Sequence, residues 1–238
     1  MLFSILSGGN IRDIIINLLL TIPVIMIALS FHEAAHGFIA YKMGDHTAYN
    51  LGRVTMNPLK HLDPLGTLCM FLVGYGWAKP VPINSRNFKD PKKGMALTAL
   101  AGPVSNLILG IIGAILYALT YALFIKNADF LYEHVFLSNI VKVILNFFFY
   151  FGFLNIGLML FNLIPVPPFD GSRIISVFLP TRIYFGIMKY ERYILYGILL
   201  ASFACSYLFD FSPISWLTNR VFGGICSPFL KLFFKIFF

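Results

Sequence analysis

Two histidines and a glutamate lie close together near the end of the first apolar stretch of the chain. The segment from His32 to His36 reads H-E-A-A-H, which fits the pattern H-E-x-x-H. On a helix, residues four positions apart share one face. Two imidazoles so placed can bind one zinc ion, and Glu33 between them can activate a water molecule. The spacing therefore predicts a metal-dependent hydrolytic site.

The stretch around this motif is long and apolar enough to cross a lipid bilayer. Residues 14–29 are mostly Ile, Leu, Val and Met, Pro23 offers a site for a kink, and the apolar run continues to Tyr41. Ionisable side chains at membrane depth cost free energy and are usually functional. We therefore expect the two histidines to bind a metal rather than only to hydrogen-bond neighbouring helices.

A second motif, far along the chain, offers a third ligand. Residues 162–171 read NLIPVPPFDG, and prolines cannot continue a regular helix. Irregular backbone at membrane depth is tolerated only when protein surrounds it or when it lines a wet cavity, and a carboxylate there needs a positive partner. We expect Asp170 to bind zinc, although it could instead cap the helix that begins near Gly171. Three side chains of the loop after the first span are alternative third ligands: His46, His61 and Asp63.

A third group of chemically useful residues opens the second apolar stretch. Residues 99–106 read ALAGPVSN, and their small side chains allow helices to approach closely. The amide of Asn106 can donate a hydrogen bond to a substrate carbonyl or an oxyanion. Its alternative role is a polar contact between helices.

The composition is that of an integral membrane protein. Of 238 residues, 58% are hydrophobic and 12% are charged, whereas soluble domains carry about 25% charged residues. The net charge of +8 suits basic loops that face anionic lipid headgroups. Motifs that stack bases or cradle phosphates are absent, so we expect the lipid bilayer as a partner and no nucleic acid. The three isolated cysteines predict neither a disulfide framework nor a cysteine metal site.

The pattern of apolar stretches predicts an all-α polytopic membrane protein that forms one domain over residues 1–238. The four predicted spans cover residues 14–41, 95–124, 140–164 and 193–209. The first three would form a catalytic core within residues 14–172, and residues 173–238 would add the further C-terminal span. The Phe-rich tail, residues 221–238, is typical of an interfacial amphipathic helix, with a fifth span as the alternative.

The loop between the first two spans is basic. Residues 42–93 carry eight Lys or Arg residues against three Asp residues, and such an excess marks the cytoplasmic side of a membrane. We therefore expect the zinc motif to lie nearer the cytosol. Within this loop, the apolar residues 65–77 are too short to span as a helix, so we expect a re-entrant or β-hairpin-like element near residues 65–83. Its extended part, Lys79–Asn84, could pair with an unwound substrate strand or serve only as a structural loop.

Together these motifs resemble those of the site-2 protease family of intramembrane zinc metalloproteases, in its compact form. Besides the two metal motifs, the matching blocks are residues 44–48, 52–58, 61–66, 77–82 and 101–106, in the family's order. The family usually has Leu where this chain has Phe169, which is a change of size at an apolar position. No PDZ-like insertion interrupts the chain, so gating by such a domain is not expected.

The resemblance implies three helices that hold one zinc ion per chain inside the membrane, with His32, His36 and Asp170 as ligands and Glu33 as the general base. It also implies that Asn106 and Asn162 stabilise the substrate or an intermediate. The expected function is hydrolysis of peptide bonds in transmembrane segments of membrane-protein substrates, in a prokaryotic cytoplasmic membrane. The identity of the substrate stays open, and so does the question of whether the protein forms an oligomer.

Two other functions could use the same residues. A metal transporter could use the ligands as a transit site, and it would tolerate Glu33→Gln if Glu33 only helps to position the metal. A catalytically silent binding protein is disfavoured, because the acid, both histidines and the aspartate are all present.

Overall fold

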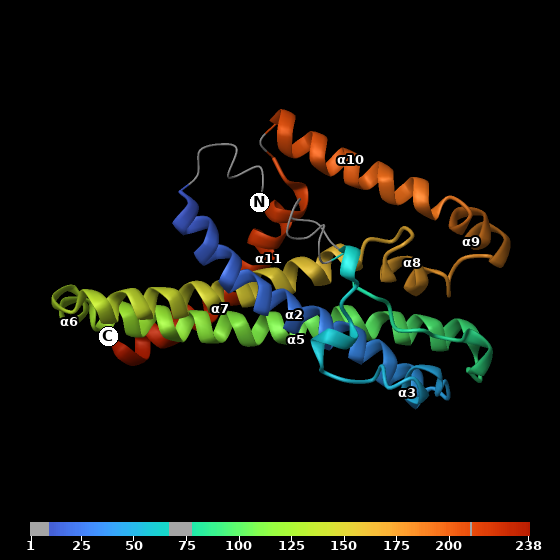
Figure 1. Ribbon diagram of the computed structural model, residues 1–238, viewed down its shortest axis with the longest axis horizontal. Helices are drawn as coiled ribbons and strands as arrows, with labels where there is room; N and C mark the ends of the chain where they lie inside the picture. Colours follow the sequence, from blue (N-terminus) through green and yellow to red (C-terminus); the bar gives the residue numbers. More distant parts are fainter. Residues whose placement is uncertain (1–9, 67–77, 210) are drawn as a thin grey trace. The chain divides into compact units, whose positions relative to one another are not determined.

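The computed structural model describes residues 10–66, 78–209 and 211–238, and within these ranges the chain is helical and forms no β-strand. The long helices are α2 (Ile11–Lys42), α5 (Pro91–Lys126), α7 (Val135–Asn162), α10 (Glu191–Phe209) and α11 (Pro213–Phe237) (Figure 1). The short helices are α3 (Thr47–Asn50), α6 (Ala128–Glu133), α8 (Asp170–Ile175) and α9 (Thr181–Met188), with 3₁₀ turns η1 (Pro58–Lys60) and η2 (Ser85–Asn87).

Four of these helices are long and apolar enough to cross a membrane. They are Ile15–Lys42 within α2, and helices α5, α7 and α10. Their positions match the four predicted spans, and the prediction of an all-α polytopic protein is confirmed. Helix α11 contains the Phe-rich tail but is not one of the four, so its relation to the membrane stays a prediction.

Helix α2 runs without a break through the H-E-x-x-H motif. The hydroxyls of Thr21 and Ser30 each donate to the carbonyl oxygen four residues earlier, at 2.6 Å, which satisfies these polar groups within the helix itself. The helix ends at Lys42. Two residues later, Gly44 has a φ of 107°, which lies in the left-handed region that favours glycine. The Gly44 N–H donates to the carbonyl of Tyr41 at this end. Both motif histidines therefore lie on regular helix.

The contacts divide the chain into two compact units. Unit 1 consists of Met1–Ser105 and Asn162–Ile194, and unit 2 consists of Asn106–Phe161 and Leu195–Phe238. Unit 1 thus contains the first span, the basic loop, the beginning of α5, and helices α8 and α9. Unit 2 contains the rest of α5, nearly all of α7, most of α10, and α11.

Unit 2 packs through small residues. A Cβ added at Gly113 of α5 would lie 2.5 Å from the backbone of Gly152 of α7, so the two helices approach as closely as glycine allows. Phe222 of α11 covers this contact and meets the ring of Phe149 edge-on, with centroids 5.6 Å apart. The buried core around it also includes Ala114, Ala118, Ile156, Met159 and Cys226.

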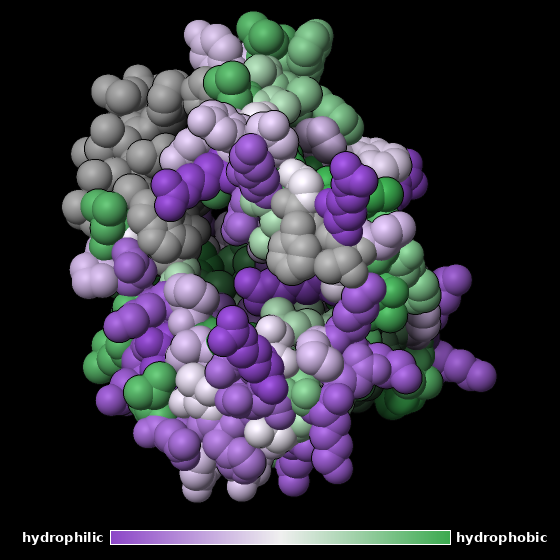
Figure 2. All heavy atoms as spheres, turned by 90° about the vertical axis from the view of Figure 1, so that its right-hand side faces the viewer, coloured by the Kyte–Doolittle hydropathy of each residue, from purple (hydrophilic) through white to green (hydrophobic). Residues whose placement is uncertain are grey.

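The loop between α2 and α5 is polar and basic where the structure describes it. Figure 2 shows hydrophilic side chains gathered on the face that includes α3 and the beginning of α5. The exposed basic residues from the end of α2 to the beginning of α5 are Lys42, Lys60, Lys79, Arg86, Lys89, Lys92 and Lys93. Of the predicted re-entrant or β-hairpin-like element, residues 67–77 lie outside the described residues. In its described part, Ala78 forms an isolated antiparallel bridge with Leu62.

Candidate metal centre

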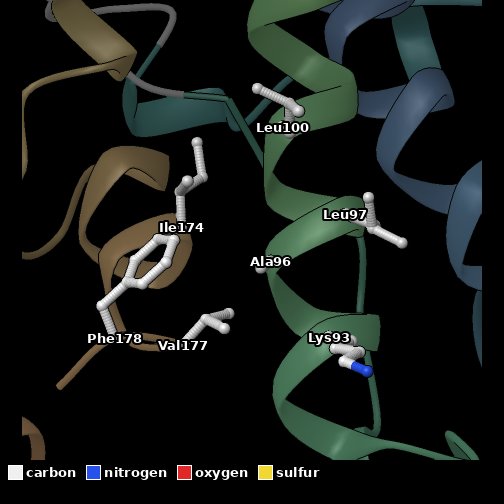
Figure 3. A pocket seen from close by; sticks show the side chains of 7 residues that line it. All are labelled: Lys93, Ala96, Leu97, Leu100, Ile174, Val177 and Phe178. Carbon is white, nitrogen blue, oxygen red and sulfur yellow. The ribbon is translucent and has the colours of Figure 1, made fainter.

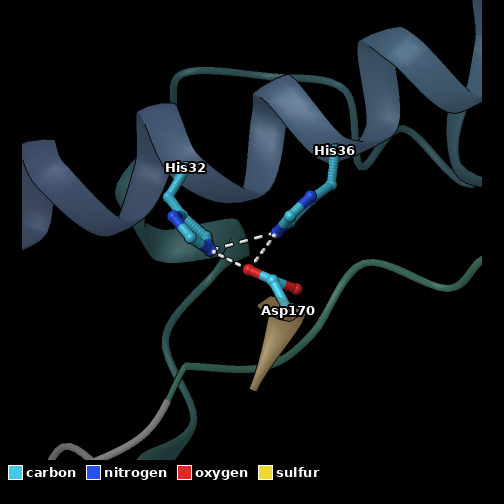
Figure 4. A group of neighbouring side chains, drawn as sticks. All are labelled: His32, His36 and Asp170. Carbon is cyan, nitrogen blue, oxygen red and sulfur yellow. Dashed lines mark hydrogen bonds and ion pairs between the residues drawn. The ribbon is translucent and has the colours of Figure 1, made fainter. Parts of the chain in front are cut away.

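The two motif histidines of α2 meet Asp170, the first residue of α8, within unit 1 (Figure 4). The Nε2 atoms of His32 and His36 lie 3.0 Å apart, and Asp170 Oδ2 lies 3.1 Å from the first and 3.2 Å from the second. All three side chains are buried, with exposed fractions of 5%, 6% and 8%. Two imidazole nitrogens and a carboxylate oxygen therefore converge on one point in a buried part of unit 1.

This group fits a zinc ion. Zinc binds His nitrogen and carboxylate oxygen at about 2.0–2.2 Å, which places tetrahedral ligand atoms about 3.3–3.6 Å apart. The three separations of 3.0–3.2 Å lie just below this spacing, so small side-chain shifts would admit the ion. Across residues 10–66, 78–209 and 211–238, it is the one cluster of three or more His, Cys, Asp or Glu side chains that could hold a metal ion.

Helix α5 fixes the protonation pattern of His36. The Nδ1 of His36 lies 2.7 Å from the backbone carbonyl oxygen of Thr98, which can only accept a hydrogen bond. Nδ1 therefore carries a proton, and Nε2 is the nitrogen that faces His32 and Asp170. A hydrogen bond to the second ring nitrogen is the usual way in which proteins orient a histidine ligand.

Two glycines allow the ligands to come together. A Cβ added at Gly102 of α5 would lie 2.5 Å from His36 Nε2 and from His32 Cε1, so any side chain there would collide with both rings. A Cβ at Gly171 would collide with the carbonyl oxygen of Leu163. The chain after α7 therefore folds back tightly enough to place Asp170 only where glycine follows it.

Glu33 has a defined partner next to this group. Its Oε2 accepts a hydrogen bond of 2.8 Å from the backbone N–H of Val81. Val81 is buried, and Glu33 is half-buried on α2 directly after His32. A carboxylate that directly follows a metal-binding residue in the chain and is oriented by one donor can serve as a general base.

Comparison with known proteins identifies the family to which the chain belongs. The sequence profile of peptidase family M50 matches residues 20–202. The chain belongs to this family. It is a zinc metalloprotease, as predicted from the two metal motifs and from their resemblance to site-2 proteases, and the His32, His36 and Asp170 group is consistent with its zinc site.

Three relatives show how far the similarity extends. "Putative zinc metalloprotease YwhC" of Bacillus subtilis is 42% identical over 169 residues, which cover 71% of this chain and 73% of that protein. "Putative zinc metalloprotease Rip2" of Mycolicibacterium smegmatis is 30% identical over 151 residues, 61% of this chain and about half (52%) of that protein. A protein of the same name from Mycobacterium tuberculosis is 24% identical over 225 residues, 88% of this chain and 80% of that protein. No solved structure matches the chain.

The alternative third ligands of this M50 protein have other surroundings. His46 is exposed and meets the ring of Tyr41 edge-on. His61 Nε2 lies 2.8 Å from the carbonyl oxygen of Thr55, and Asp63 accepts the N–H of Gly66 at 2.8 Å. Asp170 is also not a helix cap, because Phe169 occupies the N-cap position of α8.

The two asparagines lie in different units. Asn106 is fully buried in unit 2, where its Nδ2 donates to Asn155 Oδ1 at 2.8 Å. Asn155 Nδ2 donates in turn to the carbonyl oxygen of Phe151, at 2.8 Å. These bonds match the alternative role of a polar contact between helices. Asn162 is the last residue of α7 and belongs to unit 1 with the metal group.

Unit 1 also contains an apolar cavity of about 310 Å³ between the beginning of α5 and α8 (Figure 3). Its lining residues are Lys93, Ala96, Leu97, Leu100, Ile174, Val177 and Phe178. On α5, the lining positions are three or four residues apart and share one helix face, whereas Thr98 and Gly102 share the opposite face. The cavity is therefore separated from the histidines by the helix itself and contains none of the predicted site residues.

Four contributors to the site were not predicted as such from the sequence. The Thr98 carbonyl and the Val81 N–H are backbone groups, which every non-proline residue carries, so no side chain signals their roles. Gly102 was predicted as part of a small-residue segment for close helix packing and lies in a family block, but no contact with the histidines was predicted. Arg53, which contacts the segment around Val81, was counted as a basic residue of the loop and as part of a family block, without a role of its own.

Proposed function

We propose that this M50 metalloprotease hydrolyses peptide bonds within transmembrane segments of membrane-protein substrates. The observation that carries the proposal is the buried convergence of Asp170 with His32 and His36, which both lie on a helix apolar enough to span a membrane. These three residues would hold one zinc ion. When bound, zinc supplies a Lewis acid that lowers the pKa of water and polarises a carbonyl group.

The remaining steps belong to the protein's own side chains. Glu33 takes a proton from the attacking water and delivers it to the leaving amine nitrogen. Glu33 directly follows the ligand His32 in the chain, and its carboxylate is held by the Val81 N–H. The hydrogen bond of His36 to the Thr98 carbonyl keeps that imidazole in the tautomer a ligand needs.

Asn106 and Asn162 are the candidates for hydrogen bonding to the oxyanion. Asn162 is the stronger candidate, since it lies in unit 1 at the end of the helix that leads to Asp170. For Asn106 the competing role is structural, because its amide already donates to Asn155.

A substrate helix must unwind locally before its peptide bond can react. We propose that the loop of residues 65–83 holds the unwound strand, through its extended part at Lys79–Asn84. The support is its location: the Val81 N–H donates to Glu33, so the extended segment lies beside the proposed general base, and an extended segment is the kind of element to which a strand can be added.

We further propose that both units form one protease domain, with residues 14–172 as a three-helix catalytic core and residues 173–238 as the C-terminal part. The domain would lie in the cytoplasmic membrane of a prokaryote, with the active site nearer the cytosol. The exposed basic residues of the loop between α2 and α5 support this orientation, because Lys and Arg accumulate on the cytoplasmic side.

The test combines zinc content with cleavage of a panel of single-span helices by the purified protein. Wild type should contain one zinc per chain and cleave, Glu33→Gln should keep zinc and lose cleavage, and His32→Ala and Asp170→Ala should lose both. Zinc transport by Glu33→Gln in vesicles, together with a wild type that cleaves no helix, would favour a metal carrier instead.

A further inference from the structure

The orientation of Glu33 depends on a segment that carries one available amide hydrogen. Residues 80–82 read Pro-Val-Pro, and proline has no backbone N–H, so Val81 is the sole backbone donor among them. The Val81 N–H donates a hydrogen bond to Glu33 Oε2, at 2.8 Å. A long carboxylate side chain would otherwise sample several rotamers, so this single bond selects the direction in which the base points.

Arg53 fixes the peptide unit from which this N–H projects. Its Nη2 donates to the carbonyl oxygen of Lys79 at 2.7 Å and lies 3.3 Å from that of Pro80. The Pro80 carbonyl and the Val81 N–H belong to the same peptide unit. In a planar trans peptide these two groups point in opposite directions. A guanidinium that holds the oxygen on one side therefore turns the N–H towards the other side, where Glu33 accepts it.

The surroundings hold Arg53 and this segment in place. Arg53 is nine-tenths buried, with an exposed fraction of 9%. The Lys79 N–H donates to the carbonyl of His61 at 2.8 Å, and the buried Asp45 accepts the N–H of Asn84 at 2.7 Å. The peptide at Pro80–Val81 is thus fixed on both sides along the chain, and Arg53 acts at its centre.

We propose that Arg53 is a positioning residue for the general base: it holds the Pro80–Val81 peptide so that the Val81 N–H orients the Glu33 carboxylate. The proposal rests on the proposed function of Glu33. Arg53 acts through the peptide and does not touch the reacting atoms. A fixed base raises the rate of the chemical step, so the effect belongs to kcat and not to substrate binding.

The sharpest test removes the donor and leaves the rest of the segment. Val81→Pro deletes the N–H at a position that already precedes a proline and so has extended backbone. Val81→Ala keeps the N–H and truncates the side chain, which makes it the matched control. With zinc content and KM within twofold of wild type, Val81→Pro should lower kcat about 30-fold or more and Val81→Ala about threefold at most, since proton transfer by a positioned group contributes about 10²–10⁴-fold.

The arginine is tested by graded substitution against a second arginine of the same loop. Arg53→Gln should lower kcat at least about tenfold, and Arg53→Lys should restore part of the rate, because one ammonium group replaces a planar fork. Arg86 is exposed, and Arg86→Gln should leave both kcat and KM unchanged. Circular dichroism and zinc content identify any variant that fails to fold. If the Arg53 variants do not fold, the kcat of Val81→Pro decides between the outcomes.

Three results would overturn the inference. They are a wild-type kcat in folded Val81→Pro, equal losses in Val81→Pro and Val81→Ala, and a raised KM with unchanged kcat in Arg53→Gln. The last would assign Arg53 to substrate binding and not to the orientation of the base. If Glu33→Gln itself cleaved at the wild-type rate, the proposed function would fail, whereas an inactive Glu33→Gln with active Val81→Pro and Arg53→Gln would refute only the positioning role.

Discussion

The protein buries two polar clusters whose hydrogen-bonding logic is opposite. In unit 2, the Asn106 amide donates to Asn155, which donates to a backbone carbonyl, so donors and acceptors alternate. In unit 1, two imidazole Nε2 atoms and a carboxylate oxygen face one another within 3.0–3.2 Å. Two imidazole nitrogens and a carboxylate oxygen that converge on one point are suited to hold a cation, whereas alternating donors and acceptors satisfy one another. The comparison separates a site for chemistry from a polar contact that joins helices.

Loss of one convergent ligand should have the largest effect. Asp170→Ala removes the single carboxylate of the group, so zinc per chain should fall at least about tenfold and cleavage about a thousandfold or more. Zinc content is measured by mass spectrometry on the purified protein. His134→Ala is the control, because His134 is exposed and packs against Phe130. Full zinc content in Asp170→Ala would place the metal elsewhere.

Crowding the ligands without changing them should be the next largest effect. Gly102→Ala adds a Cβ within 2.5 Å of both imidazoles, and zinc affinity should fall about 10–100-fold, as it does when the support of a ligand is disturbed. Titration with a competing chelator measures this affinity. Gly223→Ala, where a Cβ meets nothing within 4 Å, should leave the affinity unchanged. Equal affinities in the two variants would contradict the packing of α5 on the histidines.

The alternating cluster should respond in stability and not in zinc. Asn155→Leu removes the acceptor of the Asn106 amide, and the free energy of unfolding should fall by about 1–3 kcal/mol. Thermal unfolding in detergent measures the loss, with zinc per chain as the control quantity. A large drop in cleavage in Asn106→Ala at unchanged stability would instead assign Asn106 to the reaction.

A third buried polar group, Asp45, predicts the smallest effect. Burial raises the pKa of its carboxyl, but hydrogen bonds donated by Thr47, Asn84 and Asn87 outweigh burial and lower the pKa below its usual value. A carboxyl with a lowered pKa in the folded state stabilises the fold above its unfolded pKa, near 4, and loses this contribution as the pH falls further. The free energy of unfolding, measured from pH 6 to pH 3, should therefore fall more steeply in wild type than in Asp45→Asn. Parallel slopes would exclude the carboxylate as the cause.

The convergence of His32, His36 and Asp170 could be predicted from the sequence because the groups that converge are side chains, which the sequence names directly. The helical period places His32 and His36 on one face, and the proline-rich break before Asp170 marks a carboxylate that needs a cation. The backbone partners could not be predicted, because the Thr98 carbonyl and the Val81 N–H become special only through tertiary packing. The same limit applies to Asn106, for which residue type alone left two roles open and only the structure supplied Asn155.

The bond from His36 to the Thr98 carbonyl ties metal affinity to the pairing of α2 with the beginning of α5. By mutual linkage, an ion that prefers the paired arrangement strengthens it, and a force that separates the helices weakens the hold on the ion. Chelation should consequently loosen the junction between these two helices, and heat should release the ion as the junction opens. Metal retention is thus a gauge of how firmly the first two spans are docked.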